Sequence, residues 1–470
     1  MKRFKVYGVY WCVNCNVPLV DEKCSLCKEN GEFVQLTKPV DPRPVFKKDL
    51  KLLQETISKE FGKEAFNLLL GKSEVIVFNR LPYLDKAYEV LVDGRVLGHL
   101  FFDFPSLEWT FKPLQEACNR LWNEKLGSWV LVDSDNVEKE QILTSIDFLD
   151  KNLENSCYVI IVSKEQKVVG VGRRINDERM VVVKTWKPRK PRYFDVKASW
   201  EKTVEANFGR LRMNVSKACK LIHGLASRLG NRMFVSYSGG KDSLATLLLT
   251  LKVLDKVEIL FNDTGLEMPE TLENVKEVAS RLGVEILRVD ADEVFWEKVK
   301  VLGVPTRENR WCCKVCKLEP MAKFLREKFS GRVLSLVGQR KPESFRRANS
   351  RDVWINRFLP DVVTCSPINR WNMLEVWLYL MMEKFDGIVN RLYFDGFERV
   401  GCFMCPSSSL ADLLTVKRKH RRLWGRWENE LKRWILSQNL PECWIDFGLW
   451  RWKYPPKRII NSLKTMKCFG

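Results

Sequence analysis

The sequence predicts a multidomain α/β protein whose largest domain contains a parallel sheet that binds a nucleotide. A chain of 470 residues is too long for one typical domain, and a hydrophobic content of 45% is enough for several packed cores. Two successive apolar strands, each followed by a polar, glycine-containing loop and a helix start, predict the parallel sheet. Two CxxC pairs near the N-terminus predict a separate small metal-binding module.

The first of the two loops follows the apolar residues 233–235 and reads Ser238-Gly239-Gly240-Lys241-Asp242-Ser243, before an apolar run that ends at Leu251. A strand, a tight loop and a helix start direct several backbone N–H groups at one point, where they stabilise a phosphate. The glycines let the backbone approach the anion, and Lys241 adds a full positive charge. A glycine pair alone is often only a turn, so the prediction depends on the next strand.

That next strand covers residues 257–261 and ends in Asn262-Asp263-Thr264-Gly265, after which Met268-Pro269 opens a helix. Open α/β sheets bind nucleotides at the carboxyl ends of their strands, where these two loops meet. The longer glycine spacing of a Walker loop is absent. We therefore predict nucleotide contacts from Ser238, Gly239, Gly240, Lys241, Asp242, Ser243, Asp263, Thr264 and Gly265.

Together with two later segments, these loops resemble the PP-loop fold of the phosphoadenylyl-sulfate and adenylyl-sulfate reductase family. The later segments are residues 337–347, with Gly338 and Arg340, and residues 366–379, with a proline and two tryptophans at a helix start. The resemblance covers residues 200–406. It implies an adenine nucleotide, which is phosphoadenylyl sulfate, adenylyl sulfate or ATP, and it makes Lys241 and Arg340 the cations that face the reacting end.

Five cysteines lie toward the two ends of the rest of this domain, in the segments Cys312-Cys313-x-x-Cys316 and Cys402-x-x-Cys405. Thiolates that converge beside an anion site hold zinc or an iron–sulfur cluster. The resemblance to the cluster-bearing adenylyl-sulfate reductases implies a [4Fe-4S] cluster on Cys312, Cys313, Cys402 and Cys405. Cys316 is the alternative ligand, because it forms a CxxC pair with Cys313 and would leave Cys312 free.

The reaction that the resemblance implies is reduction of an activated sulfate to sulfite. In the family, a cysteine near the C-terminus attacks the sulfur, and a thioredoxin-like dithiol regenerates it. Cys468 is the candidate here, but it lacks the Glu, Gly and His of the family's context. The alternative function is an RNA (tRNA) sulfur transferase that uses ATP to adenylate a base.

The N-terminal part of the chain divides into three predicted pieces. In residues 1–38 the four thiols look like a zinc ribbon, with tetrathiolate iron as the main rival; they are Cys12, Cys15, Cys24 and Cys27. Residues 39–125 form an α/β module of unknown role, with a helix over residues 50–70 and a hairpin that turns at Asp93-Gly94. Residues 126–190 resemble the PUA domain, a β-barrel that binds RNA, and a stiff cationic linker follows from Trp186 to Arg192.

The net charge of +20 is concentrated in residues 407–470, which hold 14 Lys or Arg against 5 Asp or Glu, and six of the 17 tryptophans. Interleaved cations and rings suit RNA, although tryptophans at helical spacing are also typical of a buried stripe. The apolar runs are too short for a membrane span and no signal peptide follows Met1. We expect a cytoplasmic protein that contacts RNA through the PUA-like domain and the basic tail.

Overall fold

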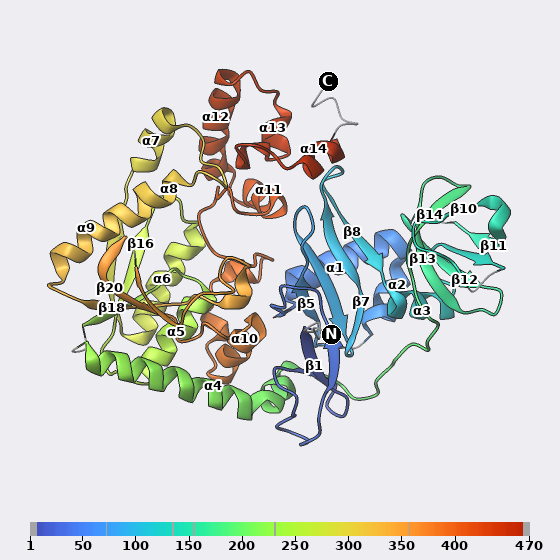
Figure 1. Cartoon of the computed structure of the whole chain (residues 1–470), viewed down its shortest axis with the longest axis horizontal. Helices are drawn as coiled ribbons and strands as arrows, with labels where there is room; N and C mark the ends of the chain where they lie inside the picture. Colours follow the sequence, from blue (N-terminus) through green and yellow to red (C-terminus); the bar gives the residue numbers. More distant parts are fainter. Residues whose placement is uncertain are drawn as a thin grey trace, which may run out of the picture. The chain divides into compact units, whose positions relative to one another are not determined.

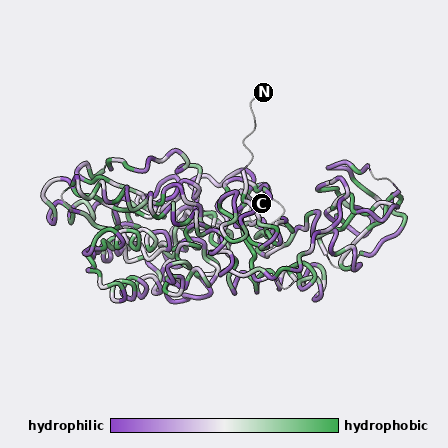
Figure 2. Tube along the Cα trace, turned by 90° about the horizontal axis from the view of Figure 1, so that it is seen from below, coloured by the Kyte–Doolittle hydropathy of each residue, from purple (hydrophilic) through white to green (hydrophobic). Residues whose placement is uncertain are grey.

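A computed structural model describes residues 7–71, 73–133, 136–153, 156–229, 232–356 and 358–463. They form two compact units (Figure 1). Unit 1 comprises Met1–Tyr83, Ala87–Asp103 and Glu108–Arg210, and unit 2 comprises Leu84–Lys86, Phe104–Leu107 and Leu211–Gly470. Hydrophobic and hydrophilic residues alternate along the whole trace (Figure 2), and no helix of the described ranges is long and apolar enough to cross a membrane.

Unit 1 begins with a small antiparallel sheet of three strands in the order β2-β1-β3. The strands are β1 Gly8–Cys12, β2 Val17–Leu19 and β3 Glu32–Gln35. Trp11 is fully buried beneath this sheet and packs against the turn at Gly94. A side chain at Gly94 would place its Cβ 2.8 Å from the Trp11 ring, so this contact requires a glycine.

A five-stranded antiparallel sheet follows, in the order β4-β5-β6-β7-β8. One face of it packs on three helices, through apolar residues that form one core with part of the next sheet. The strands are β4 Arg43–Pro44, β5 Val77–Arg80, β6 Ala87–Val92, β7 Arg95–Asp103 and β8 Glu108–Pro113, and the helices are α1 Lys47–Phe61, α2 Lys63–Leu70 and α3 Gln115–Asn123.

The structure confirms the predicted hairpin and corrects the predicted helix. In the hairpin of β6 and β7, Val92 pairs with Arg95, and both turn residues have positive φ, 52° for Asp93 and 65° for Gly94. The single helix predicted over residues 50–70 is wrong, because the chain breaks at Gly62 into α1 and α2. Gly62 has a φ of 88°, a conformation that glycine adopts without strain and that no α-helix contains.

The third sheet of unit 1 has six strands in the order β10-β14-β13-β12-β9-β11, with β9 and β12 parallel and the other pairs antiparallel. Apolar residues of these strands form a second core. The strands are β9 Trp129–Val132, β10 Ile142–Thr144, β11 Phe148–Asn152, β12 Tyr158–Ser163, β13 Val168–Arg174 and β14 Arg179–Thr185. The long helix α4, Trp200–Arg228, begins in unit 1 and continues in unit 2.

The sheet of unit 2 has the order β17-β16-β15-β18-β20-β19 and is parallel except for its edge strand β19. The chain moves outward from β15 in one direction to β16 and in the other to β18, so a crevice for a ligand is expected beyond the ends of β15 and β18. The strands are β15 Met233–Ser236, β16 Glu258–Asp263, β17 Glu285–Asp290, β18 Val333–Val337, β19 Val353–Asn356 and β20 Leu359–Cys365.

Helices connect these strands and complete the C-terminal part of unit 2. They are α5 Lys241–Leu251, α6 Pro269–Leu282, α7 Val294–Leu302, α8 Trp311–Cys313, α9 Glu319–Lys328, α10 Met373–Met382, α11 Leu410–Lys419, α12 Arg421–Ser437, α13 Cys443–Asp446 and α14 Lys457–Leu463. Trp424, Trp427 and Trp450 of the basic tail are buried in a core. These rings hold the tail in place and are not available for stacking on bases.

Candidate nucleotide and cysteine site

The loop after β15 is shaped by its own hydroxyl groups and glycines. The Ser243 hydroxyl donates to the Gly240 carbonyl at 2.8 Å and lies 3.3 Å from the Ser238 backbone nitrogen, which donates to it. Gly239 has a φ of 70°, and a Cβ there would lie 2.8 Å from the Thr271 methyl group. Gly240 is the N-cap of α5, so the loop leads directly into the positive end of a helix.

The two predicted cations of this site share one carboxylate. Lys241 Nζ lies 3.0 Å from Asp242 Oδ2, and Arg340 Nε lies 2.8 Å from Asp242 Oδ1. Burial alone would raise the pKa of the Asp242 carboxyl, but the charges of Arg340 and Lys241 outweigh it and hold that pKa below its usual value. Both cations are almost fully buried, and the trio keeps one net positive charge.

Gly338, at the end of β18, lies against the start of α5. A Cβ on Gly338 would come within 2.4 Å of the Asp242 carbonyl carbon and 2.5 Å of the Ser243 nitrogen. Real Cβ atoms do not approach backbone this closely, so only glycine lets β18 pack on the loop. This contact places Arg340, two residues later, beside Asp242.

The second loop, after β16, is organised by Glu267. Its carboxylate accepts hydrogen bonds from the Thr264 nitrogen at 2.9 Å, from the Thr264 hydroxyl at 2.8 Å and from the Leu266 nitrogen at 3.2 Å. Asp263 accepts from the Gly265 nitrogen at 3.0 Å and from Arg288 at 2.7 Å. Burial is the largest cause of the raised pKa of Glu267. The predicted residues Asp263, Thr264 and Gly265 thus form one ordered turn.

More cations surround Arg340. Burial and the charges of Arg399, Arg340 and Arg310 lower the pKa of Arg347 to about 10. Glu343 pairs with both Arg347 and Arg399, the latter at 2.8 Å. Arg347 and Arg399 share the single carboxylate of Glu343, so this group adds one more positive charge beside the Asp242 trio, which suits a ligand with several negative charges.

The cysteine segment 402–405 lies directly on the second nucleotide loop. Cys402 pairs with Glu267 as an antiparallel bridge, and the Phe403 nitrogen donates to the Leu266 carbonyl at 2.8 Å. The Cys402 sulfur lies 3.8 Å from the Thr264 hydroxyl. The cysteine segment and the loop after β16, more than 130 residues apart in the sequence, thus form one wall of the site. The sequence alone could not show this.

The other cysteine segment forms α8 and a five-residue π-helical turn, η2 Lys314–Leu318. Such turns within helices are often found at functional sites. Cys316 is fully buried, and its carbonyl accepts from the Asn262 side chain at 3.2 Å. Cys312 is hydrogen bonded to Cys313, and charge on Cys402 and Cys405 raises the pKa of Cys312 in addition to this bond and to burial. Cys312, Cys402 and Cys405 are therefore near neighbours.

The pKa of Cys313 moves in the opposite direction. The hydrogen bond from Cys312 lowers this pKa most, and the charges of Arg310 and Lys317 lower it further, against the effect of burial. Burial raises the pKa of Cys402.

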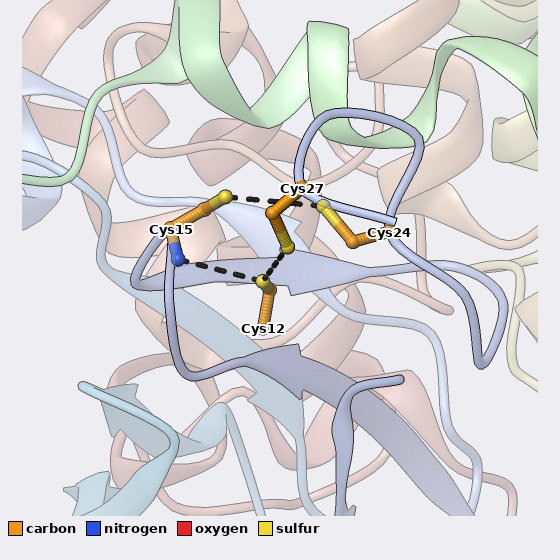
Figure 3. A group of neighbouring side chains, drawn as sticks. All are labelled: Cys12, Cys15, Cys24 and Cys27. Carbon is orange, nitrogen blue, oxygen red and sulfur yellow. Dashed lines mark hydrogen bonds between the residues drawn. The ribbon is translucent and has the colours of Figure 1, made fainter. Parts of the chain in front are cut away.

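Within the described residues, only one group of three or more metal-ligating side chains has its ligand atoms within 4.8 Å of one another: Cys12, Cys15, Cys24 and Cys27. The four side chains point toward one another from two turns (Figure 3). Cys12 Sγ is 3.4 Å from Cys27 Sγ, and Cys15 Sγ is 3.9 Å from Cys24 Sγ. A tetrahedron of thiolates around one ion with metal–sulfur bonds of about 2.3 Å requires sulfur separations of this size.

The geometry adds residues that the sequence analysis did not single out. Glu267 was not predicted as a site residue, and Arg347 falls only within the segment 337–347. Tyr393 was missed entirely, although its hydroxyl accepts from the Lys241 nitrogen at 3.1 Å. Its distance from Lys241 in the sequence leaves no local signal. The predicted nucleophile Cys468 lies outside the described residues.

Comparisons with known proteins relate the whole chain to one family and its C-terminal half to a second. The uncharacterized protein MJ0066 of Methanocaldococcus jannaschii is 39% identical, over 94% of this chain and 96% of its own length. The chain belongs to the MJ0066 family. Residues 232–408 also match the family described as "Phosphoadenosine phosphosulfate reductase domain". The C-terminal half therefore contains a reductase domain of the PP-loop family.

Two further comparisons each cover less than half of this MJ0066-family chain. Adenosine 5′-phosphosulfate reductase 1 of Bacillus subtilis is 29% identical over 43% of this chain and 82% of its own length. A crystal structure of phosphoadenylyl-sulfate reductase from Candida auris covers 42% of this chain and 93% of its own, with 18% identity and a TM-score of 0.33.

Proposed function

We propose that unit 2 binds an adenine nucleotide with its anionic end on Ser238–Ser243 and carries out the chemistry of that end beside the cysteines. The observation that carries the proposal is the shared wall of the site. Cys402 is bridged to Glu267, which itself orders Thr264 of the second nucleotide loop. A ligand held by both loops would therefore present its reacting end to the cysteine segment.

The cations define how the nucleotide would bind. Backbone N–H groups at the start of α5 would meet the phosphate of the anionic end, and Lys241 and Arg340 would neutralise its charge. Because Asp242 already shares these two cations, their positions are fixed before the ligand arrives. Such preorganisation lowers the entropy that binding costs.

The cysteine thiols near the two loops fit the ligand type of a [4Fe-4S] cluster. Cys312, Cys313, Cys402 and Cys405 would hold it, as the resemblance to the cluster-bearing reductases implies. The fifth thiol, Cys316, is fully buried and is not assigned as a ligand. A bound cluster would supply charge and electronic polarisation next to the anion.

The reaction supported best is reduction of an activated sulfate. A cysteine thiolate, for which Cys468 is the candidate, would attack the sulfate sulfur, the bond from that sulfur to the phosphate oxygen would break, and the adenine nucleotide would leave with both electrons of the bond. A thioredoxin-like dithiol would then reduce the S-sulfocysteine, which releases sulfite, regenerates the thiol and leaves the dithiol as a disulfide.

An anaerobic assay tests this reaction. Purified protein with adenylyl sulfate or phosphoadenylyl sulfate and a dithiol reductant should release sulfite and the corresponding adenosine phosphate in equal amounts. Cys468→Ser should abolish release while nucleotide binding stays the same. Full activity of this variant would remove Cys468 from the mechanism, and no sulfite from either substrate would contradict the reductase reaction.

A second function, sulfuration or a related modification of RNA with ATP, is favoured by unit 1. We propose that residues 1–38 form a zinc ribbon and that residues 126–190 form a PUA-like barrel. A small-molecule reductase needs neither of them, nor the cations that unit 1 exposes. Mass spectrometry of tRNA nucleosides from a deletion strain tests this function, because a missing thionucleoside supports it and an unchanged nucleoside profile contradicts it.

A further inference from the structure

The linker between β14 and α4 is held in place by buried side chains of α3. Gln115 donates to the Lys187 carbonyl at 2.6 Å, and Asn119 donates to the Arg189 carbonyl at 2.8 Å. Arg120 donates to the Arg192 carbonyl at 2.6 Å. None of these three α3 side chains is more than 6% exposed. Three buried polar groups of α3 thus fix the backbone of this linker.

The linker's own side chains are cationic and point to solvent. Lys187, Arg189 and Lys190 are exposed, and among the described residues none of the three has a carboxylate within ion-pair distance. The nearby carboxylates have other partners: Asp93 and Glu116 both pair with Arg120, and Arg192 uses two of them. Glu32 pairs with its guanidinium at 2.6 Å, and Glu116 accepts from its backbone nitrogen at 2.7 Å. We name residues 184–192 the cationic strap.

The strap runs beside cations of the five-stranded sheet, and both of its ends can be located. Near its start, burial and the charges of Lys112 and Lys184 lower the pKa of His99 to about 3. Near its end, burial and the charges of Arg192 and Arg189 lower the pKa of Arg95. Since Lys112 and His99 are cross-strand partners and Arg95 begins β7, the strap follows β7 along the sheet. We call the strap together with the sheet cations near its two ends the cationic surface of unit 1.

An exposed aromatic ring lies beside this surface. Lys112 Nζ donates to the Tyr83 hydroxyl at 3.2 Å, and that oxygen lies 3.0 Å from His99 Nδ1. The residue Tyr83 is 37% exposed, and its ring centroid lies 5.1 Å from that of the half-buried Phe101. The ammonium group of Lys112 has no carboxylate partner among the described residues, and Lys184 adds a like charge nearby. Lys112 and the ring of Tyr83 thus lie together without a negatively charged partner among the described residues.

We propose that the cationic strap, with Lys112 and Tyr83, binds a single-stranded segment of RNA. Fixed cations match a chain of phosphates, and an exposed ring beside them matches an unpaired base, which RNA loops and ends present and duplexes do not. An acidic protein surface would use the cations but leave Tyr83 without a partner. The inference goes beyond the proposed function, since it concerns unit 1 and holds for either reaction in unit 2.

The experiment is fluorescence anisotropy of a labelled single-stranded RNA with the full chain. The triple variant Lys187→Gln, Arg189→Gln, Lys190→Gln should bind at least tenfold more weakly, and the slope of log affinity against log salt should fall by roughly 2, at about 0.7 per lost phosphate contact. A matched triple removes the same charge from the helices behind the sheet: Lys47→Gln, Lys48→Gln, Lys63→Gln. These lysines are also exposed, and this variant should bind like the wild type.

Tyr83→Ala should weaken binding about fivefold or more without changing the salt slope, because it removes stacking and no charge. An equal loss in both triples would overturn the proposal, as would stronger binding to duplex DNA or no binding of RNA by the wild type. Adenylyl sulfate and ATP binding should be identical in the strap triple and the wild type. A failure in RNA binding is thereby distinguished from a failure at the nucleotide site.

Discussion

The two cysteine groups of this chain are built in opposite ways. Cys12, Cys15, Cys24 and Cys27 come from one short segment, and their sulfurs lie within 4.8 Å of one another. The second group joins α8 to a segment almost 90 residues later, and it is placed by hydrogen bonds to a nucleotide loop. The first group needs only its own turns, whereas the second exists only once the parallel sheet of unit 2 has folded.

The difference teaches how environment assigns a role to the same side chain. The first group lies in the apolar core around the small three-stranded sheet, which includes Trp11. The second has Arg310 and Lys317 beside Cys313, and Glu267 and Thr264 beside Cys402. A closed set of four thiolates serves structure, and a set open to a substrate site serves chemistry.

The largest expected effect is on the first group. Cys24→Ser should eliminate the metal of unit 1 and unfold the three-stranded sheet, because structural zinc contributes about 10–16 kcal/mol of apparent binding free energy to such modules. Cys157→Ser is the matched control, since Cys157 is exposed and lies outside both groups. Zinc content and limited proteolysis of residues 7–38 measure the effect. Retention of zinc by Cys24→Ser would contradict the closed four-thiolate site.

On the nucleotide side of the second group, Asp242→Asn should destabilise unit 2 by about 3–5 kcal/mol, because Lys241 and Arg340 would lose their buried counter-charge. Asp255→Asn, an exposed position, should change little. The folded pKa of Asp242 is depressed, so its stabilisation is complete above the unfolded pKa of about 4 and is lost as the pH falls through the lower folded value. The difference in stability between the wild type and Asp242→Asn, read from denaturation curves, should therefore begin to shrink as the pH falls below about 4.

Gly338→Ala separates nucleotide binding from cluster assembly. The added methyl group must displace backbone at Asp242 or Ser243, at a cost of about 1–3 kcal/mol. We expect nucleotide affinity to fall at least tenfold while the iron content stays the same. Gly387→Ala meets no atom within 4 Å and should match the wild type in both measurements. Unchanged affinity in calorimetric titrations of Gly338→Ala would exclude the proposed path of the nucleotide.

The smallest effect is expected for Cys316→Ala. This thiol is buried against the core and is not a proposed ligand, so the change should cost roughly 1 kcal/mol and leave iron in place. Iron quantification together with a thermal midpoint measures both quantities. Loss of iron from this variant would make Cys316 a ligand and Cys312 the free thiol.

The features that could be predicted from the sequence are local, like the first cysteine group, and the others depend on distant segments, like the second. The CxxC pairs and the Ser238–Ser243 loop were predictable because their chemistry lies in neighbouring residues. The resemblance supplied Arg340 and Gly338. Tyr393 had no local pattern, since its contact with Lys241 depends on the whole domain. The helix break at Gly62 was missed because the apolar periodicity continues through it.

The most direct test of the account is a metal analysis of the anaerobically purified protein and two variants. The account predicts about one zinc and about four iron per chain, with equal sulfide, in the wild type. Cys24→Ser should lose zinc alone, and Cys402→Ser should lose iron and sulfide alone. Iron absent from the wild type, or a second zinc in place of it, would contradict the central claim that the second cysteine group holds a cluster beside the nucleotide.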